Sequence, residues 1–259
     1  MDKLLSNLTI DNTITSITNN SNDSDIVQFI KTLKIIIPTI RNNYNKNSNI
    51  YHGEKIHLTI SGLIGVGKTT FVKKFSQIKD CKIFEESVEN NPYLDKFYEN
   101  PTRYAFETQI HFLSQRLLDY NNSIDIQLNE PVCIFDRHLI EDYVFAKTCF
   151  KQKYLTQLQF NTYKQLFDEL INNIKKPDLF IFLKATPETC YERINKRKRI
   201  SENGIKLEYL KTLAEAYDEF IEEYNGKFFI IILNWENFVE FDFIFNMLTS
   251  LLVSNKNVV

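Results

Sequence analysis

Three of the chain's six glycines, Gly62, Gly65 and Gly67, lie within six consecutive positions. They belong to the segment GLIGVGKT, which fits the pattern G-x-x-x-x-G-K-[ST] and stands between an apolar run, IHLTIS, and a helix-like segment, FVKKFSQI. In that setting glycines let backbone N–H groups wrap a phosphate, and the following helix N-terminus adds partial positive charge. The segment predicts a nucleotide phosphate site, and the alternative is a tight turn that holds no ligand.

The residues that end this segment would add side-chain contacts to the same phosphates. Lys68 is expected to reach the β- and γ-phosphates, and Thr69 to bind Mg²⁺ through its hydroxyl, with Thr70 beside them. A phosphate loop predicts a bound nucleotide and leaves the reaction open.

Acidic residues at the ends of two later apolar runs suit phosphoryl transfer. KIFEE ends in Glu85 and Glu86, and a carboxylate there can accept the proton of an attacking hydroxyl. VCIFD ends in Asp136, followed by Arg137; the acid suits Mg²⁺ and the arginine suits a transferring phosphate. The alternatives are a solvated acidic edge for the first pair and a helix cap paired with its neighbouring arginine for the second.

A helix predicted over residues 103 to 120 carries polar side chains on its apolar stripe. Gln109 and Arg116 are seven residues apart, which is two helical turns, so both point the same way. Each needs a partner if buried, since an unpaired polar group costs roughly 1–3 kcal/mol or more. Asp142 is one candidate partner and the edge of a planar base is another, whereas a purely structural Gln-Arg-Asp network is the alternative.

Basic residues gather in the segment CYERINKRKR, residues 190 to 199. Arg193 and Arg197 lie one helical turn apart, and Arg199 lies just beyond. Such a run suits a nuclear signal, a nucleic-acid patch or a solvated helix face. In a phosphoryl transferase it also suits a mobile lid whose arginines close over the phosphates.

These residues need elements that bring them together. Nearly continuous apolar runs alternate with segments of helical periodicity, at 56 to 61, 82 to 86, 132 to 136, 178 to 184 and 228 to 233. Such runs suit strands buried on both faces, so they predict a parallel sheet covered by helices, a doubly wound α/β domain. Ligands bind beyond the carboxyl ends of these strands, where the glycines and the acids fall.

The N-terminal part of the chain differs from the rest in composition. Residues 1 to 53 are predicted to form an Asn-rich extension, and residues 54 to 259 the main domain. We expect residues 1 to 22 to be disordered or loosely attached, because their composition buries little apolar surface. Residues 25 to 43 have helical apolar spacing, with a break expected at Pro38.

Composition limits the partners and the compartment. A formal net charge of -2 gives no general reason to expect nucleic acid or an anionic membrane as partner. The four cysteines include no C-x-x-C pair, which argues against a zinc ribbon or disulfide framework and fits a reducing compartment. No uncharged run approaches the roughly 18 residues of a membrane span. The N-terminus lacks a signal or transit pattern, so we expect a cytoplasmic protein.

From about residue 56 to 245 the chain resembles the deoxynucleoside kinase family, which contains deoxycytidine, deoxyguanosine and deoxyadenosine kinases. Motifs beyond the phosphate loop carry the resemblance by their order and spacing: Glu86-Ser87-Val88, Tyr98-Glu99-Asn100-Pro101, Asp136-Arg137, ATPETC at 185 to 190 and GIKLEYL at 204 to 210. The resemblance implies a P-loop kinase with a five-stranded parallel sheet flanked by helices, an arginine lid, and a homodimer formed through a helical bundle.

The resemblance also implies a role for each matching residue. Glu86 would be the general base for the 5′-hydroxyl. Cations would offset charge on the phosphates, supplied by Lys68, Arg137, Arg193, Arg197 and Arg199. The nucleoside would contact residues at its sugar and base, which are Tyr98, Gln109, Arg116, Asp142, Phe145 and Glu202. Asn237 and Phe238 fall in the loop that contacts the adenine of the donor, ATP.

Two residues depart from the family pattern or vary within it. His138 stands where the family usually has serine, which makes the local orientation of Arg137 an open point. Phe112 is bulkier than its counterpart in animal deoxycytidine kinases and resembles that of the bacterial purine-preferring members.

The predicted function is ATP-dependent phosphorylation of a deoxynucleoside at its 5′-hydroxyl, in nucleotide salvage. Arg116 paired with Asp142 suits amino-bearing bases and is awkward for the thymine methyl group, so deoxyadenosine, deoxyguanosine or deoxycytidine is expected over thymidine. One alternative is a nucleoside monophosphate kinase of the thymidylate type, which shares the phosphate loop, an Asp-Arg pair and a lid. Another is a nucleotide-binding switch, but the sequence has no N-K-x-D motif to read a base.

Overall fold

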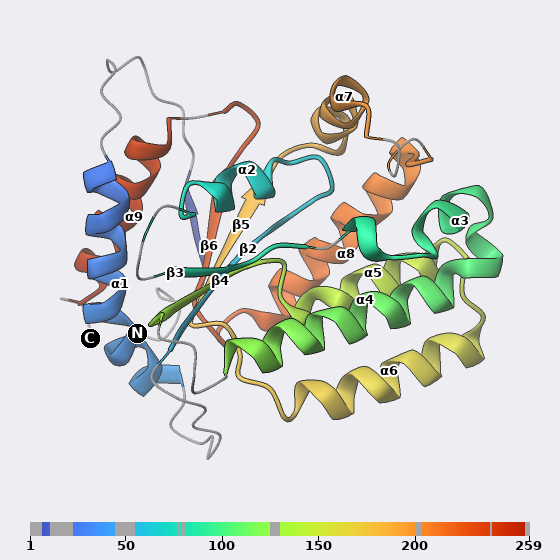
Figure 1. Cartoon of the computed structure of the whole chain (residues 1–259), viewed down its shortest axis with the longest axis horizontal. Helices are drawn as coiled ribbons and strands as arrows, with labels where there is room; N and C mark the ends of the chain where they lie inside the picture. The colour runs from blue at the N-terminus through green and yellow to red at the C-terminus, as the bar shows by residue number, and fades with distance from the viewer. Residues whose placement is uncertain are drawn as a thin grey trace.

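A parallel sheet of six strands forms the centre of the computed structural model, which describes residues 7–10, 23–44, 55–76, 78, 81–86, 88–124, 130–199, 202, 204–238 and 240–256 (Figure 1). The strands are β1 (Asn7–Ile10), β2 (Ile56–Gly62), β3 (Cys81–Phe84), β4 (Val132–Asp136), β5 (Leu179–Lys184) and β6 (Ile230–Asn234). Their order across the sheet is β1-β6-β5-β2-β4-β3. Strands β2 to β6 match the five predicted apolar runs, so the predicted α/β fold with five parallel strands is confirmed. Strand β1 is an additional, sixth strand that was not predicted.

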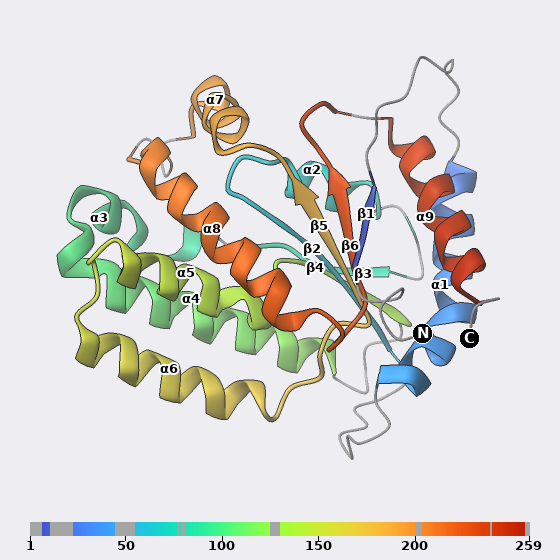
Figure 2. The same ribbon diagram turned by 180° about the vertical axis from the view of Figure 1, so that it is seen from behind.

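Helices cover both faces of the sheet. They are α1 (Asp23–Tyr44), α2 (Lys68–Lys73), α3 (Leu94–Glu99), α4 (Pro101–Ser123), α5 (Asp142–Lys151), α6 (Gln157–Ile171), α7 (Pro187–Arg197), α8 (Leu207–Tyr224) and α9 (Phe241–Lys256), with 3-10 turns at Val88–Asn90 and Leu139–Glu141. Helices α1 and α9 lie side by side on one face, while α4, α5, α6 and α8 form the layer on the other (Figures 1 and 2).

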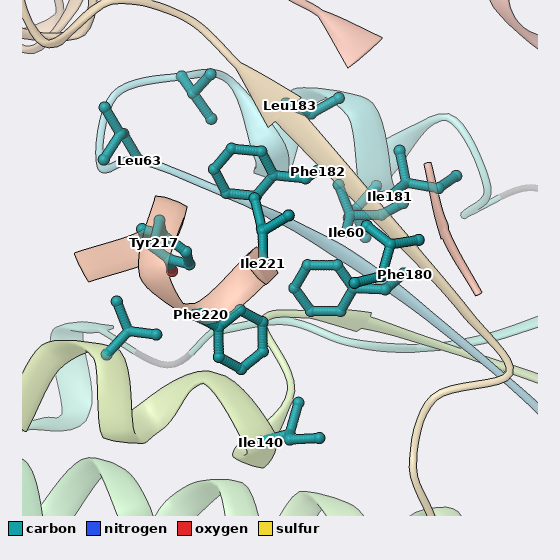
Figure 3. Packing of buried hydrophobic residues seen from close by; sticks show 14 of the residues in the cluster. Ile60, Leu63, Ile140, Phe180, Ile181, Phe182, Leu183, Tyr217, Phe220 and Ile221 are labelled. Carbon is teal, nitrogen blue, oxygen red and sulfur yellow. The ribbon is translucent and has the colours of Figure 1, made fainter. Parts of the chain in front are cut away.

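The apolar strands hold the layers together because both of their faces are buried. Every residue of β2 and β4 is buried. Between the sheet and α8, the ring of Phe180 lies 5.7 Å from that of Phe220, and Phe182 lies 5.2 Å from Tyr217 (Figure 3). Burying each such side chain stabilises the fold by about 1.5–3 kcal/mol. This packing fixes the strand ends at which the phosphate loop and the acidic residues lie.

The N-terminal segment corrects two predictions. Residues 7–10 were expected to be disordered or loosely attached, yet they pair with residues 230–233 of β6 as a parallel edge strand. The helix predicted from residue 25 continues through Pro38 to Tyr44 without the expected break. Packing of its buried face against α9 stabilises it despite the lost backbone hydrogen bond. The other residues of the predicted disordered segment, and the proposed boundary at residue 53, lie outside the described residues.

Among the described residues, no helix has both the length and the apolar character needed to cross a membrane.

Candidate active site

The glycines of the phosphate loop allow close backbone approaches that a side chain would block. Gly62 has φ 140° and Gly65 has φ 86°, both in the region that L-residues rarely adopt. A Cβ atom on either would lie 2.5 Å from a backbone oxygen, that of Leu183 for Gly62 and that of Cys190 for Gly65. The loop is therefore held tightly against β5 and α7, and α2 begins directly after it at Lys68.

Lys68, Thr69 and Asp136 lie together at the end of this loop. Lys68 Nζ donates to the Leu63 carbonyl oxygen at 3.2 Å. Burial, followed by the charge of Arg137, lowers the pKa of Lys68 to about 8. Thr69 Oγ1 donates to Asp136 Oδ2 at 2.7 Å. These three residues come from two neighbouring strand ends, as the sequence predicted.

The same residues form a fitting donor set for Mg²⁺. Asp136 Oδ1 is buried without a hydrogen-bond partner, and the Thr69 hydroxyl lies on the other oxygen of the same carboxylate. One carboxylate and one hydroxyl, completed by phosphate oxygens and water, is the way Mg²⁺ is commonly bound. The described residues include no cluster of three or more His, Cys, Asp or Glu suited to a metal. Thr70 is exposed on α2.

Glu86 lies between two arginines at the carboxyl end of β3. Its Oε2 accepts from Arg137 Nε at 3.1 Å, and its Oε1 forms an ion pair with Arg116. Arg116 also contacts Asp142, the partner expected from the sequence, so it joins two carboxylates. Burial by itself would raise the pKa of Glu86, but the charges of Arg137 and Arg116 outweigh it and lower that pKa. Glu86 is therefore ionised at neutral pH, as a general base must be.

Arg137 is held from several sides. Its backbone has φ 72°, and its guanidinium contacts Glu141 Oε2 at 3.3 Å as well as the Tyr217 hydroxyl. It also lies 4.6 Å from the centre of the Phe145 ring. Glu141 and Tyr217 were not identified in the sequence, although Glu141 follows Arg137 by four residues, a spacing that suits an ion pair.

His138 caps the 3-10 turn Leu139–Glu141, which follows β4. The ring Nδ1 of His138 accepts from the backbone N–H of Ile140 at 3.2 Å, and the backbone N–H of His138 donates to Glu141 Oε1 at 2.9 Å. Burial lowers the pKa of His138 to about 3, so the ring stays neutral and can accept. The sequence left open how Arg137 is oriented beside a histidine; in the structure His138 is compatible with the contact between Arg137 and Glu86.

A cavity of about 380 Å³ connects the phosphate loop with Glu86. Predicted site residues line it: Gly65, Gly67, Lys68, Thr69, Glu86, Tyr98, Gln109, Arg116, Arg137, Phe145, Arg197, Arg199 and Glu202. The lining also includes residues that the sequence did not single out for contact, among them Val88, Leu94, Phe97, Thr108 and Tyr209. Asp136 and Asp142 are buried behind the cavity, where they contact Thr69 and Arg116.

The sugar and base end of the cavity is closely packed. A Cβ atom on Gly204 would lie 2.3 Å from Tyr98 Cβ, so this glycine lets the segment before α8 approach Tyr98. Gln109 is buried, and its Nε2 donates to Cys149 Sγ at 3.6 Å. Glu202, also buried, accepts from Arg197 Nε at 2.6 Å. The predicted nucleoside contacts thus lie at one end of the cavity and the phosphate loop at the other.

The three predicted lid arginines differ in position. Arg197 and Arg199 line the cavity. Arg193 instead donates to the backbone oxygens of Val66 at 3.1 Å and Glu236 at 2.9 Å. It also lies 4.3 Å from the centre of the Phe238 ring. Arg193 therefore joins the phosphate loop to the loop after β6, in which the predicted adenine contacts Asn237 and Phe238 are exposed.

This fold and arrangement define a P-loop kinase: a phosphate loop opening a helix, a carboxylate at the adjoining strand end, and a cavity between them. The sequence model described as deoxynucleoside kinase matches residues 58–254. The chain belongs to the deoxynucleoside kinase family, and it is an enzyme that phosphorylates a deoxynucleoside.

Named relatives and solved structures agree with this assignment. The deoxyadenosine kinase of Dictyostelium discoideum is 36% identical over 209 residues, which are 81% of this chain and 82% of that protein. The deoxyguanosine kinase of the same organism is 34% identical over 216 residues, 80% of this chain and 76% of that protein. The structure of deoxyadenosine kinase from M. mycoides with bound dATP has a TM-score of 0.65 at 28% identity, covering 78% of this chain and 99% of that chain.

Proposed function

We propose that this kinase transfers the γ-phosphoryl group of ATP to the 5′-hydroxyl of deoxyadenosine, deoxyguanosine or deoxycytidine in preference to thymidine. The observation that carries the proposal is Arg116, which lines the cavity and forms ion pairs with both Asp142 and Glu86. Fixed charged donors and acceptors at this place suit the amino and ring-nitrogen groups of those three bases, and suit a thymine methyl group poorly.

The mechanism follows from the positions of the chain's own groups. Glu86 accepts the proton of the 5′-hydroxyl as that oxygen attacks the γ-phosphorus. Arg137, which already contacts Glu86, stabilises the charge that develops on the transferring group together with Lys68, Arg197 and Arg199. Tyr98 and Glu202 hold the sugar, Gln109 and Arg116 the base, and Phe145 packs beside it. Thr69 and Asp136 would hold Mg²⁺, which would supply positive charge at the phosphate oxygens.

A coupled ADP-release assay tests the function directly. The purified protein is given ATP and Mg²⁺ with each of the four deoxynucleosides, and separately with each of their 5′-monophosphates. We expect turnover with deoxynucleosides, and a kcat/KM for thymidine below that of the best of the other three. Thymidine as the best substrate would overturn the base preference, and turnover with monophosphates alone would favour a thymidylate-type kinase.

We further propose that the enzyme is a homodimer. The layer formed by α4 and α6 carries exposed leucines: Leu118 is 53% exposed, Leu158 77% and Leu166 41%. Exposed apolar side chains on neighbouring helices are typical of an association surface. Light scattering coupled to size-exclusion chromatography should give twice the chain mass, and Leu158→Glu should shift it toward that of a single chain. A wild-type mass of one chain would contradict the proposal.

A cytoplasmic location and a role in nucleotide salvage complete the proposal. All four cysteines are free, which suits a reducing compartment. A product that carries a 5′-phosphate is a substrate for further phosphorylation to the triphosphate. Fractionation of cells with an antibody to the native protein tests the location.

A further inference from the structure

A group of buried aromatic rings joins the N-terminal helix to the phosphate-loop helix. We call it the aromatic bridge, and it consists of Phe29, Phe71, Phe75, Trp235 and Phe245. On α1, the Phe29 ring lies 6.3 Å from that of Phe75 and 5.5 Å from that of Phe245. Phe75 follows α2 directly, and its ring lies 6.1 Å from that of Phe71, which is within α2. All five side chains are at most 1% exposed.

The other end of the aromatic bridge reaches the phosphate loop itself. Phe71 lies one turn after Lys68, and its ring makes an edge contact with Trp235 at 5.6 Å. The indole Nε1 of Trp235 lies 3.4 Å from the place where a Cβ of Gly67 would be. That nitrogen is buried and makes no hydrogen bond. The indole ring therefore approaches the loop through packing, whereas the Trp235 backbone is joined to the loop by Arg193, which donates to the oxygens of Trp235 and Val66.

Helix α1 lies outside the part of the chain that the family match covers. The match begins at residue 58, whereas α1 ends at Tyr44. The matched structure of M. mycoides deoxyadenosine kinase is covered over 99% of its length but accounts for only 78% of this chain. Phe29 therefore packs on the α2 side of the sheet from a segment that the family match does not cover.

We propose that Phe29 is a positioning residue for the phosphate-donor site. Its ring packs on Phe75 and Phe245, these pack on Phe71, and Phe71 and Trp235 support α2 and the loop at Gly67. Loosening this packing lets α2 shift, and the loop's N–H groups then meet the phosphates less well, because interiors are densely packed and transmit such changes. The nucleoside end of the cavity lies on other elements and is not supported by Phe29. The inference rests on the proposed donor site at the phosphate loop.

The test compares two buried phenylalanines in the full chain. Phe29→Leu removes the ring from α1. Phe167→Leu is the control, because it removes an equally buried ring from α6, in the layer on the opposite face of the sheet. The centre of the Phe167 ring lies 5.5 Å from that of Tyr143 and 6.4 Å from that of Tyr163. Both variants are assayed for Tm, for the KM of ATP and for the KM of the best deoxynucleoside. We expect Phe29→Leu to raise the KM of ATP by about fivefold or more, and the KM of the nucleoside by less than about twofold. Phe167→Leu is expected to lower Tm without raising the KM of ATP.

A second readout uses the chain's single tryptophan, Trp235. Its fluorescence reports on the aromatic bridge without turnover, so we expect Phe29→Leu, and not Phe167→Leu, to shift its emission to longer wavelength. Phe29→Met, which keeps most of the volume, serves if Phe29→Leu does not fold, with the same expected split between the two KM values.

Two results would overturn the proposal. One is a Phe29 variant that loses stability yet keeps the wild-type KM for ATP, since Phe29 would then be only structural. The other is an equal rise of both KM values, which would indicate a general loss of the fold. Failure of the proposed function is distinguishable, because the wild-type enzyme would then show no turnover with ATP and a deoxynucleoside.

Discussion

At the scale of single residues, the site is built around Glu86. Its carboxylate contacts both Arg116, proposed to bind the base, and Arg137, proposed to act on the transferring phosphate. On these proposed roles, Glu86 lies where the two substrates meet. Its neighbour Glu85 lines the same cavity but is exposed, so the paired acids noticed in the sequence have different surroundings.

We expect Glu86→Gln to lower kcat by about 100-fold, as loss of a general base should. The amide keeps the shape of the side chain but cannot take up the proton of the 5′-hydroxyl. Steady-state kinetics with saturating ATP measures the effect, and Glu85→Gln is the matched control, expected to stay within about twofold of wild type. Near-normal turnover of Glu86→Gln would remove Glu86 from this role.

Asp142 should make nucleoside binding depend on pH. Burial raises the pKa of Asp142 to about 7, although the charge of Arg116 acts in the opposite direction. Asp142 is therefore protonated below about pH 7, and the ionised partner that holds Arg116 at the base is lost. We expect kcat/KM for the deoxynucleoside to fall as the pH decreases from 8 to 6, roughly following one titrating group.

Asp142→Asn is the control for this pH effect. Its side chain is uncharged at every pH, so kcat/KM should be low and nearly independent of pH between about 6 and 8. If the variant kept the wild-type pH profile, the titrating group would be another residue.

At the scale of elements, helix α7 contains two kinds of arginine. Arg193, near its middle, donates to backbone oxygens of the phosphate loop and of the segment after β6, whereas Arg197, in its last turn, reaches Glu202 in the cavity. Arg193 thus attaches α7 to the phosphate loop and to the segment after β6, whereas Arg197, at the C-terminal end of α7, lines the cavity where it can contact phosphates. The sequence spacing of one helical turn did not distinguish these roles.

We expect Arg193→Ala to destabilise the protein by about 1.5–3 kcal/mol, because it removes charged hydrogen bonds to three backbone oxygens. Arg197→Ala should instead lower kcat by about tenfold or more. Urea unfolding and steady-state kinetics of both variants provide the comparison. The opposite assignment, a stable Arg193→Ala with strongly reduced kcat, would show that Arg193 is the mobile lid residue.

At the scale of the whole molecule, the N-terminal segment is packed on the kinase domain. Strand β1 lies along the edge of β6, and α1 covers α9 (Figures 1 and 2). The buried side of α1 includes Phe29 and Leu33, and that of α9 includes Phe245 and Leu248. This segment was predicted to be an extension with one helix packed on the main domain, and the described residues agree with that helix.

Removal of residues 1–44 should therefore leave a chain that aggregates, because it exposes the apolar side chains of α9, each worth about 1.5–3 kcal/mol when buried. Removal of residues 1–22 keeps α1 and should give a folded protein with a lower Tm. Solubility, size-exclusion chromatography and thermal unfolding distinguish the two. A monodisperse, active protein that begins at residue 45 would show that α1 is dispensable.

The five core strands, the phosphate loop and the acids at strand ends were predictable from the sequence, because each depends on local order. Glycine spacing reports backbone conformation, and a buried parallel strand must be apolar along its whole length. Arg116 was predicted to need a partner because it lies on the apolar stripe of its helix; Asp142 was one candidate from the residues, and the family resemblance implied the pairing that the structure has.

Contacts between residues far apart in the chain were decided only by the tertiary structure. Glu141 and Tyr217 hold Arg137 from a turn and from α8, and nothing near Tyr217 in the sequence indicates this. Residues 7–10 (NLTI) alternate polar and apolar side chains over only four positions, too short a stretch to predict a strand, yet the edge of β6 supplies hydrogen-bond partners for them. Arg193 and Arg197 cannot be told apart from the sequence, because they differ only in their contacts: Arg193 contacts backbone oxygens, and Arg197 contacts Glu202. The sequence by itself determined the fold class, the phosphate loop and the residue types of the site, whereas packing decided which of those residues touch, because such contacts depend on all the layers at once.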